Sequence, residues 1–174
     1  MTCEVYDNFL DQEVFSNIQR LMLSADIPWF MNMHIVKPDY KEIDDLYNYQ
    51  FTHVFYRNHA HCSEFFSDCI DPLFFKINPS AIIRVKANLI PRTHETITHQ
   101  MHVDVDHFKG KTAIFYINTN NGKTIFEDGT EIDSVENRLV VFDSNMLHTG
   151  TTCTDTRARC LINLNYYTWN VDET

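Results

Sequence analysis

The sequence predicts a mainly β protein whose helices are confined to the N-terminal part. In the second half of the 174-residue chain, short apolar segments follow one another closely, with Asn-, Asp- and Gly-containing turn signals between them. Helical spacing of apolar residues is found only in the first half. Many short strands separated by turns are typical of a barrel or a double-sheet jelly roll (a double-stranded β-helix), as in cupin-like domains. We expect one domain over residues 1–174, with helical support over about residues 8–77 packed outside a jelly-roll core over about residues 80–168.

The first helix is predicted over about residues 11–24. Asp11 is a candidate N-cap, and Pro28 stands beyond the end of the pattern. Trp29, which follows, is predicted to be a packing residue. The apolar residues that recur at helical spacing are Val14, Phe15, Ile18, Leu21 and Met22. This helix is expected to pack against the sheet.

The next segments combine a loop, a strand and a second helical pattern. Residues 37–50 are polar and irregular, which predicts a surface loop or a substrate lid. Residues 50–56 alternate as a strand. Residues 63–77 have helical spacing with Ser63 as a candidate cap, but Pro72 predicts a kink or a break into two helices.

A strand with two different faces is predicted over residues 81–90. Alternate side chains of a strand point to opposite faces, so Arg84, Lys86 and Asn88 share one face and apolar residues the other. Asn88 can be read equally well as a residue facing water or as part of a pocket floor.

The C-terminal half supplies most strands of the predicted jelly roll. Residues 100–104 are expected to be extended. Residues 120–123 contain Asn-Gly and predict a tight turn, and residues 127–129 predict another. The remaining predicted strands are residues 112–118, 124–126, 139–142 and 159–167.

The composition excludes several classes of protein. The formal net charge of -10 weighs against nucleic acid or an anionic membrane surface as partner, and no apolar run is long enough to span a bilayer. The N-terminus lacks the basic and apolar regions of a signal peptide. The five cysteines form no C-x-x-C pair, so we expect free thiols in a reducing, cytoplasmic compartment. The sequence carries no signal for an oligomeric state.

Two histidines and one carboxylate form a candidate metal site. His102 and Asp104 are two residues apart, so an extended segment would point both to one face, and His148 follows a buried-type strand and a turn. This ligand set is typical of non-haem Fe(II) sites that keep coordination positions open. Asp106 competes with Asp104, which has the expected spacing. Nearby histidines predicted to lie on the surface are His94, His99 and His107.

Arg159 is the candidate anchor for a dicarboxylate co-substrate. It lies on the strand after His148, and because hairpin neighbours run side by side, we expect it close to the metal. Arg157 has the same parity along the strand and is the alternative. Arg159 is preferred because the strand pattern that follows it matches better.

Five segments of the chain carry motifs in a characteristic order: HVDVD at 102–106, IFYIN at 114–118, NGKTIF at 121–126, RLVVFDSNMLHTG at 138–150 and RCLINLNYY at 159–167. In order and spacing they resemble the Fe(II)/2-oxoglutarate-dependent dioxygenases, and within them the prolyl-hydroxylase-like branch. The N-terminal part resembles small microbial or viral members.

The resemblance implies a role for each matching residue. The iron ligands would be His102, Asp104 and His148. Arg159 would pair with the C5 carboxylate of 2-oxoglutarate, and Tyr116 would hydrogen-bond to the same carboxylate. Asn163 would lie near the co-substrate, and Thr124 stands in the Gly-x-Thr pattern of the family. The implied cofactors are Fe(II), 2-oxoglutarate and O₂, with ascorbate as a further candidate.

The expected reaction is hydroxylation with release of succinate and CO₂. A carboxylate at Asp104 leaves no open site for halide and argues against halogenation. Peptidyl proline is the first candidate substrate, and a free amino acid or another small molecule is the alternative. Residues 37–50 and 92–99 would carry the specificity. The competing interpretations are a non-catalytic metal-binding jelly roll, a zinc site with the same ligands, and a nucleic-acid demethylase, which the net charge disfavours.

Overall fold

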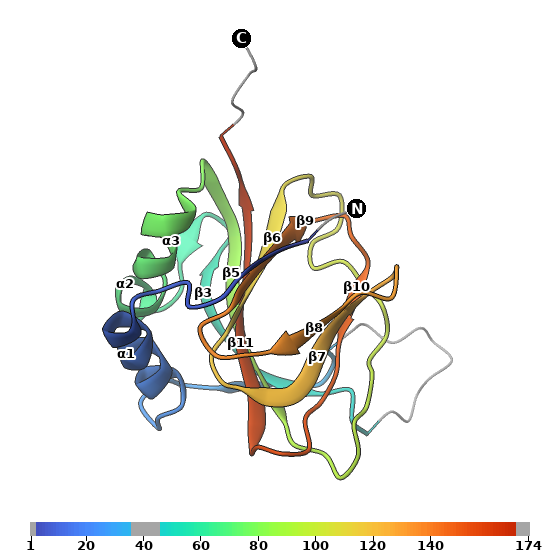
Figure 1. The fold of residues 1–174 in the computed structure, drawn as a ribbon. Coiled ribbons are helices and arrows are strands. Elements are labelled where there is room, and N and C mark those ends of the chain that lie inside the picture. Colours follow the sequence, from blue (N-terminus) through green and yellow to red (C-terminus); the bar gives the residue numbers. More distant parts are fainter. Residues whose placement is uncertain (1–2, 36–45, 170–174) are drawn as a thin grey trace.

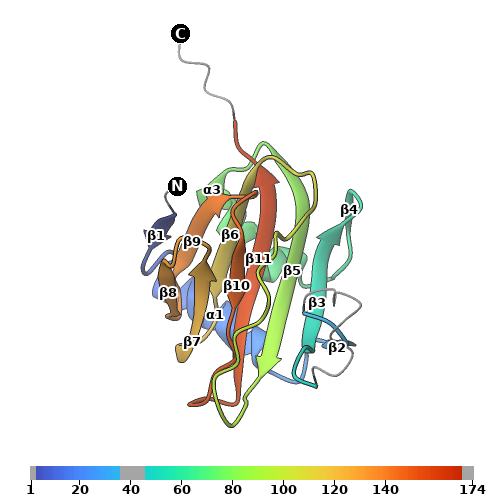
Figure 2. The ribbon, with the colours of Figure 1, turned by 90° about the vertical axis from the view of Figure 1, so that its right-hand side faces the viewer.

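The computed structural model describes residues 3–35 and 46–169, which contain two antiparallel sheets (Figure 1). The larger sheet has, in spatial order, β1 (Glu4–Tyr6), β9 (Leu139–Asp143), β6 (Lys111–Tyr116), β11 (Ala158–Tyr167), β5 (Ala81–Pro91), β3 (Gln50–Arg57) and β2 (Phe30–Asn32), and β4 (Ala60–His61) pairs with β3. The smaller sheet has the order β10 (His148–Gly150), β7 (Asn120–Phe126) and β8 (Glu131–Ser134). Figure 2 shows the long central strands β6, β11 and β5 side by side.

Three helices cover one face of the larger sheet: α1 (Gln12–Met22), α2 (Phe66–Cys69) and α3 (Asp71–Ile77). In Figure 1 they lie on the opposite side of that sheet from the smaller sheet. The architecture is therefore a jelly roll with helices packed on the outside, which confirms the predicted fold class. No helix among the residues described here is long and apolar enough to cross a membrane.

Two cores follow from the alternation of side chains along the central strands. On β6 and β11, Phe115 and Ile162 face the helices, whereas Ile114 and Leu161 face the smaller sheet. Burying one such side chain stabilises the fold by about 1.5–3 kcal/mol. Because both faces are covered, these strands read as nearly continuous apolar runs.

The predicted boundaries of most elements agree with the structure. Asp11 is the N-cap residue of α1, although its side chain makes no capping hydrogen bond. The second helical pattern is broken in two, and Pro72 lies in the first turn of α3, as expected. Trp29 packs against the helix-side core, as predicted. Of the predicted loop 37–50, residues 37–45 lie outside the described part of the chain.

The predicted tight turn at residues 120–123 is wrong. These residues begin β7, and the Asn-Gly pair lies inside a strand. A Cβ atom on Gly122 would lie 2.7 Å from Cδ of Arg159, so glycine is needed here for a close approach. The Asn-Gly pair predicts a turn, but the physical reason for the glycine is a side chain that crosses from the other sheet.

Two smaller predictions also fail. Ser63 does not cap the first short helix, because α2 begins at Phe66 and has Phe65 as its N-cap residue. Residues 100–104 do not form a full strand; they contribute an isolated bridge between His102 and His148. That bridge is nevertheless what positions the candidate metal site.

Candidate metal centre

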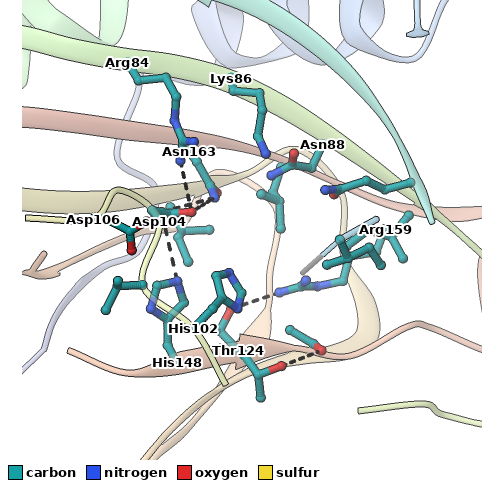
Figure 3. Close-up of a pocket in the computed structure, with 18 residues that line it drawn as sticks. Arg84, Lys86, Asn88, His102, Asp104, Asp106, Thr124, His148, Arg159 and Asn163 are labelled. Atoms are coloured by element: carbon teal, nitrogen blue, oxygen red, sulfur yellow. Dashed lines mark hydrogen bonds and ion pairs between the residues drawn. The ribbon is translucent and has the colours of Figure 1, made fainter. Parts of the chain in front are cut away.

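The structure brings His102, Asp104 and His148 together at one point between the sheets (Figure 3). One ligand atom of each residue lies within 4.8 Å of the others. Two backbone hydrogen bonds hold the two histidines side by side: the His102 amide donates to the His148 carbonyl at 2.9 Å, and the reverse pair is 3.1 Å apart. His148 opens β10, so the smaller sheet supplies one ligand and the adjacent loop supplies the others.

Backbone carbonyls orient both imidazole rings. Nδ1 of His102 lies 3.2 Å from the carbonyl oxygen of Gln100, and Nδ1 of His148 lies 3.0 Å from that of Met146. A carbonyl oxygen only accepts, so each Nδ1 carries the proton and each Nε2 is left as a metal ligand. Burial lowers the pKa of His102, and the adjacent His148 acts in the same direction, which favours the neutral form that binds a metal.

Asp104 is held as a carboxylate by its surroundings. Nδ2 of Asn163 donates to its Oδ1 at 3.2 Å, and Nη2 of Arg84 forms an ion pair with the same oxygen, also at 3.2 Å. Burial alone would raise the pKa of Asp104, but the positive charge of Arg84 and of the other nearby cationic groups outweighs it and lowers the pKa. Asp106 is exposed and does not belong to the cluster.

Arg159 lies in a slot that fits its side chain closely. It is 1% exposed, its Nε donates to Oγ of Ser134 at 2.8 Å, and its Nη2 donates to Oγ1 of Thr124 at 2.9 Å. Cβ atoms on Gly122 and Gly150 would lie 2.7 Å from its Cδ and 2.9 Å from its Nη1. Burial lowers the pKa of Arg159, and it forms no ion pair with an acidic residue in the described ranges.

The route by which Arg159 reaches the site differs from the prediction. The strands β10 and β11 are not hairpin neighbours, because β10 pairs with β7 in the smaller sheet and β11 pairs with β5 and β6 in the larger one. The arginine instead reaches across the space between the sheets. Arg157, the alternative candidate, is exposed and does not line the pocket.

The other two residues implied by the resemblance are Tyr116, which does not line the pocket, and Asn163, which does. Tyr116 is fully buried behind Thr124, and the two hydroxyl oxygens are 2.7 Å apart. Asn163 lines the pocket and contacts Asp104. His99, predicted on the surface, is buried, and its backbone amide donates to the carbonyl of Gly150. His94 and His107 are exposed as predicted.

A pocket of about 510 Å³ contains both the metal cluster and Arg159. Its lining residues are Ile35, Gln50, Arg84, Lys86, Asn88, Ile90, His102, Val103, Asp104, Asp106, Ile114, Thr124, His148, Thr149, Gly150, Arg159, Leu161 and Asn163. The polar face of β5 thus faces the pocket, which settles the two interpretations of Asn88. The sequence carries a signal for this pocket wall, because three polar residues alternate in a strand whose other face is apolar.

The donor set fits a divalent metal and a dicarboxylate. Two imidazoles and one carboxylate leave coordination positions open on an ion such as Fe(II). A fully buried guanidinium without an acidic partner in the described residues fits the far carboxylate of a molecule that chelates that ion. Both features open into the same pocket.

Solved structures with the same fold exist, although the sequence matches no protein-family model and no curated protein. A prolyl hydroxylase from Trichoplax adhaerens, in complex with a hypoxia inducible factor peptide, aligns with a TM-score of 0.62, 16% identity and coverage of 95% of this chain and 83% of that one. A Pseudomonas putida prolyl-4-hydroxylase aligns with a TM-score of 0.56, 16% identity and coverage of 94% and 92%.

A third neighbour is the epimerase SnoN in complex with Fe³⁺, α-ketoglutarate and nogalamycin RO. It aligns with a TM-score of 0.63, 9% identity and coverage of 95% of this chain and 78% of that one. At sequence identities this low, the alignments are evidence for the fold alone. The chain therefore has the fold of the 2-oxoglutarate–Fe(II) oxygenases and their prolyl hydroxylases, as the resemblance in the sequence implied.

Proposed function

We propose that this protein is an Fe(II)- and 2-oxoglutarate-dependent oxygenase that hydroxylates an unactivated C–H bond. The observation that carries the proposal is that a His-Asp-His cluster and the buried Arg159 face one pocket. The first can hold iron with positions left for ligands, and the second can hold the far carboxylate of 2-oxoglutarate. The neighbour that contains iron and α-ketoglutarate supports this interpretation.

Each part of the site has a defined task in this reaction. Bound iron, 2-oxoglutarate and O₂ would supply the oxidising chemistry, with succinate and CO₂ as co-products. The Gln100 and Met146 carbonyls fix the imidazole rings, and Asn163 orients Asp104. Arg159 and Thr124 set the position of the co-substrate, which decides which C–H bond of the substrate is closest to the metal.

Two substrate classes fit the fold. One neighbour is a prolyl hydroxylase bound to a peptide, which supports peptidyl proline, and another is bound to the small molecule nogalamycin RO. A specific feature of this chain favours a small molecule: unpaired polar groups lie deep in the pocket, on the face of β5.

The test is succinate release by purified protein reconstituted with Fe(II), supplied with 2-oxoglutarate and O₂. We expect succinate formation that a substrate accelerates and that His148→Ala abolishes, because one ligand of the cluster is lost. Tight Zn²⁺ binding with no succinate formed under any condition would contradict the proposal and favour a non-redox zinc site. If replacing Arg159 had no effect on any activity of the protein, a non-catalytic metal-binding jelly roll would be favoured.

A further inference from the structure

Lys86 is a cation in the pocket that the proposed cofactors leave without a partner. It lies on β5 between Arg84 and Asn88, and its side chain points into the pocket (Figure 3). It makes no hydrogen bond or ion pair with any residue in the described part of the chain. Arg84, by contrast, is paired with Asp104.

The charges of the loaded site leave Lys86 unbalanced. In the proposed complex, one carboxylate of 2-oxoglutarate would be neutralised by the metal and the other by Arg159. Burial lowers the pKa of Lys86 to about 8, Arg84 acts in the same direction, and Asp104 opposes the shift in part. Lys86 is half-buried, and an ammonium group that is partly removed from water and has no close counter-ion is stabilised by any anion that enters beside it.

The pairing register of β5 and β11 places Lys86 level with the metal cluster and away from Arg159. On the paired strands β5 and β11, Lys86 is opposite Asn163, and Ile90 is opposite Arg159. The two rows are four residues apart, roughly 13 Å along the strand at about 3.3 Å per residue. Lys86 therefore borders the metal end of the pocket, away from the arginine that would hold the far carboxylate of 2-oxoglutarate, and a substrate would lie at this end.

Two buried amide oxygens in the same pocket need hydrogen-bond donors. Oδ1 of Asn88 and Oδ1 of Asn163 are buried and have no donor within the part of the chain that the structure describes. 2-Oxoglutarate carries carboxylates and a ketone, which only accept, so it cannot satisfy these oxygens. A second ligand with N–H or O–H groups can.

These observations, together with the proposed function on which they rest, define the substrate class. We propose that Lys86 binds the carboxylate of a free amino acid and that Asn88 and Asn163 accept hydrogen bonds from its ammonium group, so that the substrate is a free amino acid. A small zwitterion also meets less repulsion from a protein of net charge -10 than an acidic peptide, which carries several negative charges.

The experiment measures binding without turnover. Protein loaded with Zn²⁺ and 2-oxoglutarate is titrated calorimetrically with the twenty free L-amino acids, proline among them, and with their primary amides, which lack the negative charge. We expect at least one amino acid to bind 10-fold or more tightly than its amide. Lys86→Gln should abolish that preference and Lys86→Arg should retain part of it. Lys109→Gln, at an exposed lysine outside the pocket, should behave as wild type.

The outcomes separate this inference from the proposed function. If no amino acid binds, if acid and amide bind equally, or if Lys86→Gln keeps the preference, the inference is wrong while the oxygenase proposal stands. If Lys86→Gln instead weakens the binding of 2-oxoglutarate itself, Lys86 belongs to the co-substrate site and the inference is also wrong. Failure of the wild-type protein to bind 2-oxoglutarate would contradict the proposed function.

Discussion

The two ends of the pocket are built in opposite ways. At one end, Arg159 is buried, hydrogen-bonded to Ser134 and Thr124, and enclosed by backbone without side chains at Gly122 and Gly150. At the metal end, Lys86 has no partner among the described residues, and neither has the amide oxygen of Asn88, which lies midway between the two ends. The difference indicates that the first end is preorganised for one constant ligand. The second end is completed by a ligand that brings its own charge and donors.

The largest expected effect, a loss of 2-oxoglutarate affinity, comes from removing the positive charge of Arg159. Arg159→Leu should weaken 2-oxoglutarate binding by about 10²–10⁴-fold, because each hydrogen bond to a charged group contributes about 1.5–3 kcal/mol. The measurement is a titration of metal-loaded protein with 2-oxoglutarate, accompanied by a thermal melt. Arg157→Leu, at an exposed position two residues earlier, is the matched control and should bind normally. Equal losses in both variants would contradict the assignment.

Asn163 and Asn88 both face the proposed substrate, but only Asn163 also holds a metal ligand, so the two residues offer a direct comparison. Asn163→Ala removes the hydrogen bond to Asp104 and should lower metal affinity by about 10–100-fold. Asn88→Ala makes the same chemical change on the adjacent strand, where no contact with a metal ligand exists among the described residues, and should leave metal affinity unchanged. Competition with a chromophoric chelator measures both. If both variants lost metal affinity to a similar extent, the cause would be a disturbed pocket structure and not the missing hydrogen bond to Asp104.

Gly150→Ala tests how closely the backbone at Gly150 encloses the side chain of Arg159. The added Cβ would lie 2.9 Å from Nη1 of Arg159, so the guanidinium must shift and 2-oxoglutarate affinity should fall by roughly 10-fold. The same substitution in the Arg159→Leu background should have almost no effect on that affinity, since the group that it displaces is gone. Additive losses would show that Gly150 acts independently of Arg159.

The smallest effect concerns stability and pH. The folded-state pKa of Lys86, about 8, lies below the usual lysine value of 10.5, so the folded state disfavours the ammonium form. This penalty is fully present below pH 8 and disappears as the pH rises towards the unfolded pKa, because the unfolded state then binds more protons. Metal-free Lys86→Met should therefore be more stable than wild type at pH 7, by about 1 kcal/mol after allowance for solvent screening. The difference in melting temperature should shrink towards pH 10; a constant difference would contradict the burial of the charge.

The same comparison shows what the sequence could predict. The face of each residue on β5 followed from alternation, because strand periodicity is a local property. The metal cluster was also accessible, since His102 and Asp104 are close in sequence and His148 follows a recognisable strand and turn. The structure brings the three together as expected.

The pairing of strands that are far apart in the sequence could not be predicted equally well. The sequence suggested that β10 and β11 are neighbours, whereas they lie in opposite sheets and Arg159 crosses between them. The same crossing explains why Gly122 was misread as a turn residue. Ser134, which accepts a hydrogen bond from Arg159, belongs to a strand that the pattern did not indicate. Which distant segments meet is decided by tertiary packing, and a local pattern does not contain that information.

The most direct test of the account is an anaerobic titration of the Fe(II)-loaded protein with 2-oxoglutarate, followed by visible absorption. We expect a weak charge-transfer band that saturates with 2-oxoglutarate. The band should be absent in His148→Ala, and in Arg159→Leu it should require a far higher concentration of 2-oxoglutarate. Absence of the band in the wild-type protein, together with tight Zn²⁺ binding, would contradict the central claim that this pocket holds iron and a dicarboxylate.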